Sequence, residues 1–149
     1  MKVSYLTLFI LLAASTAFAG EREQLHVDKD RLAIKGYDPV AYFDGTATAG
    51  KPELTAEYGG AVYRFANDAN RQKFVADPPH YAPAYGGWCA TAMADGSKVD
   101  IDPTSFKVTD GHLYLFYKGV FGDARKKWVK DEPGNVTKAD GEWKKLTAK

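Results

Sequence analysis

Cys89 is the single cysteine of this chain, and its thiol could take part in several kinds of chemistry. It lies in the stretch Tyr81-Ala-Pro-Ala-Tyr-Gly-Gly-Trp-Cys-Ala90, which also holds three aromatic residues and a Gly-Gly pair. Its thiolate could bind a soft metal ion, or it could act as a redox nucleophile at the start of a helix. A free cysteine is also often buried as a small hydrophobic residue. The sequence leaves these three roles open.

A metal site at Cys89 needs further ligands, and His80 is the first candidate. The two residues are nine positions apart in the chain, which allows both side chains to face one cavity. Because two ligands alone would hold a soft metal weakly, a third is expected from Asp38, Met93 or another residue. The ion expected at such a site is copper or zinc.

The tyrosines offer a second kind of site. Aromatic rings could line a pocket for an apolar or planar ligand, with their hydroxyl groups fixing its orientation. The residues expected there are Tyr42, Tyr63, Tyr81, Tyr85 and Trp88, with Tyr37 and Tyr114 as further candidates. The same rings could instead form the hydrophobic core. The chain has no Ser-His-Asp order, His-Glu-x-x-His pattern or phosphate-binding glycine loop, so a binding module is expected rather than an enzyme.

Turn and cap signals place these residues on short strands and helices. Hairpins are predicted over 56–65, turning at Gly59-Gly60, and over 105–117, turning at Asp110-Gly111. His112 follows the second turn and is expected to face solvent. The segment 80–83 is expected to be extended. Helices are predicted over 68–76 with Asn67 as its cap, over 88–95 with Cys89 in its first turn, over 120–130, and over 136–146. Pro133-Gly134 is expected to end the helix over 120–130.

The N-terminus predicts export. Residues 1–19 have the lysine, the apolar run and the Ala17-x-Ala19 ending of a signal peptide, so the mature chain is expected to begin at Gly20. Residues 20–31 are predicted to be a flexible N-terminal arm with His26 facing solvent, and residues 32–146 to be one domain. The protein is therefore expected to be periplasmic or secreted, with no stable membrane anchor after cleavage.

The charges give no reason to expect nucleic acid or an anionic membrane as a partner. Loss of Lys2 reduces the 20 basic side chains to 19, which equals the 19 acidic ones. The basic run Arg125-Lys126-Lys127 lies in a predicted helix, where a solvated face is its expected role. A single cysteine excludes an internal disulfide, so the core must stabilise the fold.

Several motifs together resemble the YHS-domain family over about Leu32 to Trp143. They are Gly36-Tyr-Asp-Pro-Val-Ala-Tyr-Phe43, Tyr58-x-x-x-x-Tyr63-x-Phe65, Pro78-x-x-Tyr81-x-Pro83-x-Tyr85-Gly-Gly-x-Cys89-Ala90 and Asp110-Gly-x-Leu-Tyr-Leu115. The resemblance implies an α+β fold with a treble-clef-like β-hairpin plus helix core, extended by a second C-terminal hairpin and helices.

The metal-binding members of that family carry cysteines that this chain lacks. Ala41, Ala66 and Asn70 stand at the corresponding positions. Alanine offers a metal no ligand, so the cysteine metal site of the family is not transferred to this chain. The family also includes selenoproteins, which favours a redox role for Cys89.

The sequence as a whole predicts an exported small binding module that binds or handles a soft metal ion, copper first, as the resemblance implies. A thiol-redox protein using Cys89 is one alternative. A structural or protein-interaction domain without a small ligand is another. The expected partner is a metal ion or a periplasmic protein.

Overall fold

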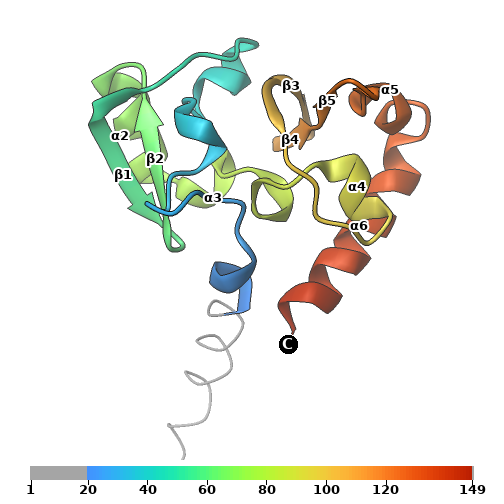
Figure 1. Cartoon of the computed structure of the whole chain (residues 1–149). Helices are drawn as coiled ribbons and strands as arrows, with labels where there is room; N and C mark the ends of the chain where they lie inside the picture. Colours follow the sequence, from blue (N-terminus) through green and yellow to red (C-terminus); the bar gives the residue numbers. More distant parts are fainter. Residues whose placement is uncertain (1–19, 149) are drawn as a thin grey trace, which may run out of the picture.

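The computed structural model describes residues 20–148, so the predicted leader, residues 1–19, lies outside the described residues. The chain has an α+β fold of small antiparallel hairpins and helices, as expected (Figure 1). Figure 1 shows one hairpin, β1–β2, in the half of the molecule opposite the C-terminal helices α5 and α6. No helix within residues 20–148 is long and apolar enough to cross a lipid bilayer.

Both predicted hairpins are confirmed. Strands β1 (Lys51–Tyr58) and β2 (Ala61–Phe65) pair antiparallel, and the turn between them uses positive φ angles of 61° and 91° at Gly59 and Gly60. Strands β3 (Asp102–Thr109) and β4 (His112–Phe116) pair in the same way around Asp110-Gly111. Each hairpin is a separate two-stranded sheet with an irregularity in its register.

The helix predicted after the first hairpin is also confirmed. Helix α2 (Asp68–Ala76) begins at Asn67, whose side chain accepts a hydrogen bond from the Asn70 amide at 2.8 Å. The segment 80–83 was expected to be extended, and Ala82 and Pro83 are. His80 and Tyr81 instead belong to the helix α3 (Pro78–Tyr81), which forms because prolines fit the first turn of a helix, where no amide donor is needed. A 3-10 turn, η3 (Ala84–Gly87), and a short helix, α4 (Ala90–Ala94), follow it.

The helix predicted over 120–130 is wrong in its first half. The chain instead forms a small hairpin of β5 (Lys118–Gly119) and β6 (Gly122–Asp123), and only α5 (Arg125–Trp128) is helical. Gly122 has a φ of 96°, which lets the turn close where a helix would need a negative φ.

The last helix begins earlier than predicted. Helix α6 (Glu132–Thr147) includes Pro133-Gly134, which we expected to end the preceding helix. The Asp131 side chain caps α6 by accepting a hydrogen bond from the Gly134 amide at 3.2 Å. Proline in the first turn of a helix loses no hydrogen bond, so the pair starts α6 instead of stopping a helix.

The buried hydrophobic residues form one cluster that joins the two halves. In the first half, Phe74 of α2 packs against Tyr63 and Phe65 of β2, with ring centroids 4.7 and 5.2 Å apart. In the second half, the Trp128 ring lies 5.0 Å from that of Tyr114. Two 3-10 turns, η1 (Ile34–Gly36) and η2 (Ala41–Asp44), bury further residues of the cluster between β1–β2 and the second half.

Residues 20–31, which we expected to form a flexible arm, contact the body of the protein. Residues 20–24 are helical, and the segment after them is bonded to the body of the protein. The His26 amide donates to the Gly86 carbonyl at 2.8 Å, and the Trp88 indole donates to the Gln24 carbonyl at 2.6 Å. The Arg31 guanidinium donates to the Gly60 carbonyl at 2.6 Å. These hydrogen bonds, together with the packing of Leu25 and Val27 against the core, hold the segment in place.

Candidate functional site

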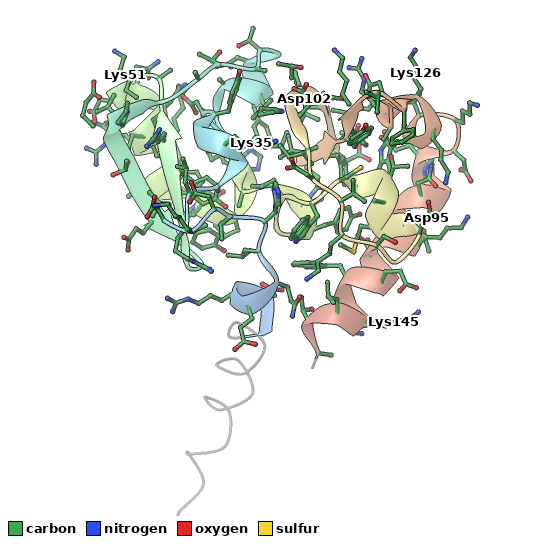
Figure 2. All side chains as sticks on the ribbon, in the orientation of Figure 1. Lys35, Lys51, Asp95, Asp102, Lys126 and Lys145 are labelled. Carbon is green, nitrogen blue, oxygen red and sulfur yellow. The ribbon has the colours of Figure 1, made fainter. Side chains whose placement is uncertain are left out.

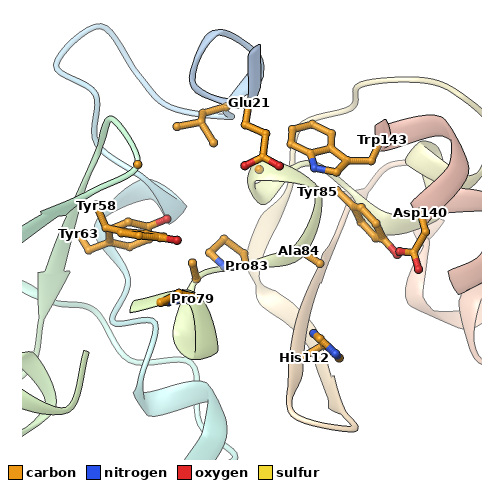
Figure 3. A pocket seen from close by; sticks show the side chains of 14 residues that line it. Glu21, Tyr58, Tyr63, Pro79, Pro83, Ala84, Tyr85, His112, Asp140 and Trp143 are labelled. Carbon is orange, nitrogen blue, oxygen red and sulfur yellow. The ribbon is translucent and has the colours of Figure 1, made fainter. Parts of the chain in front are cut away.

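Two adjoining cavities of about 320 and 520 Å³ lie on either side of Tyr85, and we call them together the Tyr85 cleft. Ala84, Tyr85, His112 and Asp140 line both cavities. The aromatic and ionisable residues of the cleft are Glu21, Tyr58, Tyr63, Tyr85, Asp110, His112, Tyr114, Glu132, Asp140 and Trp143. Figure 3 shows Tyr58 and Tyr63 on one side of the first cavity, with Tyr85, Asp140 and Trp143 on the other.

The first wall comes from the β1–β2 hairpin. Tyr58 ends β1, and Tyr63 lies in β2 with its ring packed on Phe74. Burial raises the pKa of Tyr63 well above its ordinary value, and burial together with Glu21 raises that of Tyr58. Both phenols are therefore neutral at physiological pH, and this wall offers a ligand π-faces and hydroxyl groups.

The second wall is built around Tyr85, whose backbone is strained. Its φ and ψ angles are 56° and 37°, in the left-handed region that residues other than glycine rarely adopt. Such a conformation costs about 1–3 kcal/mol. It directs the Tyr85 hydroxyl to the Asp140 Oδ1 atom of α6, to which it donates a hydrogen bond at 2.9 Å. Burial, followed by this bond, raises the pKa of Tyr85 and keeps it a donor.

Trp143 completes the second wall, one helical turn after Asp140. Its ring lies against Gly86, where an added Cβ atom would be 2.7 Å from the Trp143 Cη2 atom. Gly86 also has a φ of 60°, which favours glycine. Glycine is therefore needed here for two reasons, its backbone conformation and the space that its missing side chain leaves for the Trp143 ring. The Gly-Gly pair thus lets the indole ring pack against the η3 turn.

The cleft is acidic. Four carboxylates line it, and among the described lining residues there is no lysine or arginine. Lys107, outside the lining, forms an ion pair with Glu132 at 2.7 Å. Burial alone would raise the pKa of Glu132, but the hydrogen bond from Lys107 lowers it below its ordinary value. Asp140, Asp110 and Glu21 have no lysine or arginine partner in the described part of the chain, which leaves the cleft with negative charge beside its aromatic rings.

Two of the five predicted ligand-binding aromatics, Tyr63 and Tyr85, line the cleft. Tyr42 is buried and donates to the Pro103 carbonyl at 2.7 Å. Tyr81 packs edge-on against Phe43, with centroids 5.1 Å apart. The Trp88 ring is 4.3 Å from His26, and the Lys98 ammonium lies over it at 5.5 Å.

Sequence reasoning missed Glu21, Tyr58, Asp140 and Trp143, and it placed His112 in solvent without a cavity beside it. One signal for two of these residues was present. Asp140 and Trp143 are three positions apart in the predicted last helix, so they share a face. This spacing indicates that the two side chains lie together, but not that they face a cavity. Glu21 gave no such signal, because it lay in the segment expected to be flexible.

The predicted metal ligands are not assembled into a metal site. Within residues 20–148 there is no group of three or more His, Cys, Asp or Glu side chains that could hold a metal ion. Cys89 is 1% exposed and belongs to the hydrophobic core, and His80 instead packs on Tyr81 with centroids 4.6 Å apart. The prediction of a metal-binding, copper-type protein is therefore wrong. A thiol so deeply buried reaches solvent only when the structure opens.

Asp38 is fully buried and satisfied by hydrogen bonds from the protein itself. Its Oδ1 atom accepts from the amides of Val40 and Ala41 at 2.8 and 3.3 Å. Its Oδ2 atom accepts from the Ala66 amide at 2.9 Å and from the Asn70 side chain at 2.8 Å. These four donors occupy the carboxylate, which joins η2 to the end of β2 and to α2.

Comparisons with known proteins do not support the expected family. No family model matches the chain, and no solved structure matches it. A MEMO1 family protein of Thermococcus onnurineus (strain NA1) is 32% identical over 98 residues, which are 64% of this chain and 34% of that protein. The chain thus spans about a third of the length of the curated relative it matches. The assignment to the YHS-domain family is wrong on these findings.

Proposed function

We propose that this protein is a small binding module whose Tyr85 cleft takes a small organic cation, such as a quaternary or primary ammonium compound. The observation that carries the proposal is the composition of the cleft. Aromatic rings and four carboxylates line it, and no lysine or arginine does so among the described residues.

An organic cation fits both parts of this lining. Its positive charge is attracted to the faces of tryptophan and tyrosine rings, by about 0.5–2 kcal/mol per contact according to how far water is excluded. Carboxylates at the rim add Coulomb attraction without forming a metal-type ligand set. The volumes of the two cavities, about 320 and 520 Å³, lie within the range of small-molecule sites.

The positions of the polar groups support this ligand class further. Asp140 is exposed and fixed by the Tyr85 hydroxyl, so it presents a charged oxygen atom at a defined place. Trp143 lies on the same helix face, three residues later. A ligand ammonium group between them would contact a carboxylate and a π-face at once, which is the arrangement that favours a cation over a neutral molecule.

The other functions expected from the sequence have less support. Thiol-redox chemistry needs an accessible thiolate, and Cys89 is buried. A structural or protein-interaction role is compatible with the fold but accounts for no feature of the cleft. A treble-clef-like description of β1, β2 and α2 and a periplasmic or secreted location stay predictions, and a periplasmic protein stays a candidate partner.

The proposal is tested with choline and its neutral carbon isostere 3,3-dimethylbutan-1-ol, titrated into the purified protein by calorimetry. We expect choline to bind and the isostere to bind at least about fivefold more weakly, because it lacks the charge. The variant Asp140→Asn keeps an acceptor for Tyr85 but removes the charge, and it should weaken choline binding about tenfold.

Asp44→Asn is the matched control, because Asp44 is exposed in η2 and lies outside the cleft. It removes the same charge and should leave choline binding unchanged. Equal affinity for choline and its isostere would contradict a cation site. Absence of choline binding to the folded wild-type protein would end the proposal.

A further inference from the structure

Val120 and Phe121 form the turn of the small β5–β6 hairpin, and we call them the hairpin tip. Their side chains are 91% and 93% exposed. Val75, the next large hydrophobic residue in order of exposure within residues 20–148, is 58% exposed. Burial of apolar surface is favourable, so two adjacent apolar side chains left wholly in water indicate a surface that is covered in the bound state.

The hairpin tip is held by the protein around it. The Ser105 hydroxyl donates to the Asp123 Oδ1 atom at 2.6 Å, and the Arg125 amide donates to the same atom at 3.0 Å. Below the turn, the Ala124 amide donates to the Tyr117 carbonyl at 2.9 Å. These bonds fix both ends of β5–β6, so the two apolar side chains project from an ordered base and lose less entropy on binding.

The charges that surround the hairpin tip and face solvent are mostly positive. Lys118, Arg125 and Lys126 are all exposed. Asp123 turns inward and keeps only 13% of its side chain exposed. Figure 2 shows Lys126 pointing away from the body of the molecule, at the edge where Figure 1 places β5 and α5. The acidic side chain of Asp102 lies near Lys118 and is the exception among these positive charges.

We propose that the hairpin tip docks this protein on an anionic lipid surface. Val120 and Phe121 would enter the boundary between headgroups and acyl chains, and Lys118, Arg125 and Lys126 would lie at the level of the phosphate groups. Apolar side chains at a tip with basic residues around them match both layers of such a surface. Arg125 and Lys126 also line, with Lys107 and Val129, a hollow of about 300 Å³ beside α5 that could receive a phosphate group.

The observations favour lipid over a protein partner. A stable protein interface buries about 800 Å² on each partner, far more than two side chains at a convex turn supply. Lipid needs no matching pocket, because acyl chains rearrange around an inserted ring. The overall charge of the chain is close to balanced, so the attraction comes from this local basic group and should be sensitive to salt.

The test is sedimentation of the purified protein with vesicles of phosphatidylcholine alone and of phosphatidylcholine with an equal part of phosphatidylglycerol. We expect binding to the mixed vesicles at low salt, weaker binding as sodium chloride is added, and little binding to phosphatidylcholine alone. The double variant Val120→Ser/Phe121→Ser should bind at least about tenfold more weakly. Lys126→Glu should lower binding at least about fivefold, because it replaces an attractive charge by a repulsive one.

Val75→Ser is the matched control, because it removes a half-exposed valine from α2 and should not change binding. All variants begin at the same N-terminal residue. A difference in vesicle binding between them therefore comes from the substituted side chains. A direct readout of insertion uses Phe121→Cys labelled with a polarity-sensitive dye, since Cys89 is buried and should not compete for it. The emission of the dye should shift to the blue with mixed vesicles.

Three results would overturn the proposal. The first is equal binding to both kinds of vesicle. The second is wild-type binding by the double variant. The third is a dimer, seen by light scattering, that the double variant abolishes, because the hairpin tip would then be covered by a second copy of the chain. Melting temperatures verify that every variant is folded, and the exposed positions make large losses of stability unexpected.

Discussion

Asp38 shows how a buried carboxylate can serve structure instead of chemistry. Its two oxygen atoms accept four hydrogen bonds from three segments of the first half of the molecule. The variant Asp38→Asn turns an NH2 group toward one of the two pairs of groups that bond the carboxylate, and both pairs are donors. We expect the free energy of unfolding to fall by about 2–4 kcal/mol, measured in urea. Asp44→Asn, on the surface, should change it by less than about 0.5 kcal/mol.

Cys89 gives a second prediction at the scale of one residue. The folded protein should react with a thiol reagent at neutral pH only as fast as it opens, because the sulfur lies in the core. The reaction should become complete once urea unfolds the chain. Phe121→Cys supplies an exposed thiol in the same protein as a positive control. Rapid labelling of the folded wild-type protein would restore a redox role for Cys89.

The η3 turn can be tested as an element through two glycines with similar backbones. Gly86 and Gly45 have φ angles of 60° and 87°. An added Cβ atom at Gly86 would meet Trp143, whereas one at Gly45 would have no other atom within 4 Å. Gly45→Ala should therefore cost only backbone strain, about 1 kcal/mol. Gly86→Ala should cost more, about 2–3 kcal/mol, because the indole ring must also move.

Comparing the melting temperatures of Gly86→Ala and Gly45→Ala separates the loss of stability due to backbone strain from the loss due to the contact with Trp143. Gly86→Ala should also shift tryptophan fluorescence, whereas Gly45→Ala should not. Equal losses of stability in the two variants would show that the Trp143 contact contributes nothing.

At the scale of elements, the sequence predicted the strands and helices that are marked by a few neighbouring residues. Gly59-Gly60 and Asp110-Gly111 located both hairpins, and Asn67 located the start of α2. The helix predicted over 120–130 is wrong in its first half because its apolar residues have helical spacing, while the glycines at 119 and 122 allow a turn. Pro133-Gly134 is typical of a helix end, and the hydrogen bond to Asp131 that makes it the start of α6 cannot be deduced from residue types alone.

The candidate site was predictable only in part, for a related reason. Tyr63 and Tyr85 were expected to line a pocket, and both line the cleft. Which tyrosines face a cavity and which fill the core depends on how the two halves pack, and Tyr42 and Tyr85 cannot be told apart by their neighbours in the chain. Asp140 entered the site through its bond to Tyr85, 55 positions away, which no local pattern reports.

At the scale of the whole molecule, His26 couples stability to pH through the N-terminal segment. Its Nε2 atom lies 2.9 Å from Asp100, yet its pKa is lowered, because burial outweighs the attraction of that carboxylate and Lys35 opposes the proton as well. The folded protein thus takes up this proton less readily than the unfolded chain, whose histidine pKa is about 6.5.

The sign follows from proton counting. Below about pH 6.5 the unfolded chain binds more protons at His26 than the folded protein does, so the free energy of unfolding decreases as the pH falls. We expect the melting temperature to drop between pH 7 and pH 5, and His26→Gln to reduce that drop. His80→Gln, at an exposed position, should retain it in full. An identical drop in His26→Gln would contradict this assignment.

The two walls of the Tyr85 cleft come from elements far apart in the order of synthesis. Tyr58 and Tyr63 belong to the first hairpin, while Asp140 and Trp143 belong to α6, the last of the described elements. A nascent chain on the ribosome can therefore fold its first hairpin early but cannot hold a ligand there until α6 has emerged. Any ligand of this cleft would act on the finished protein and could not serve as a template during translation.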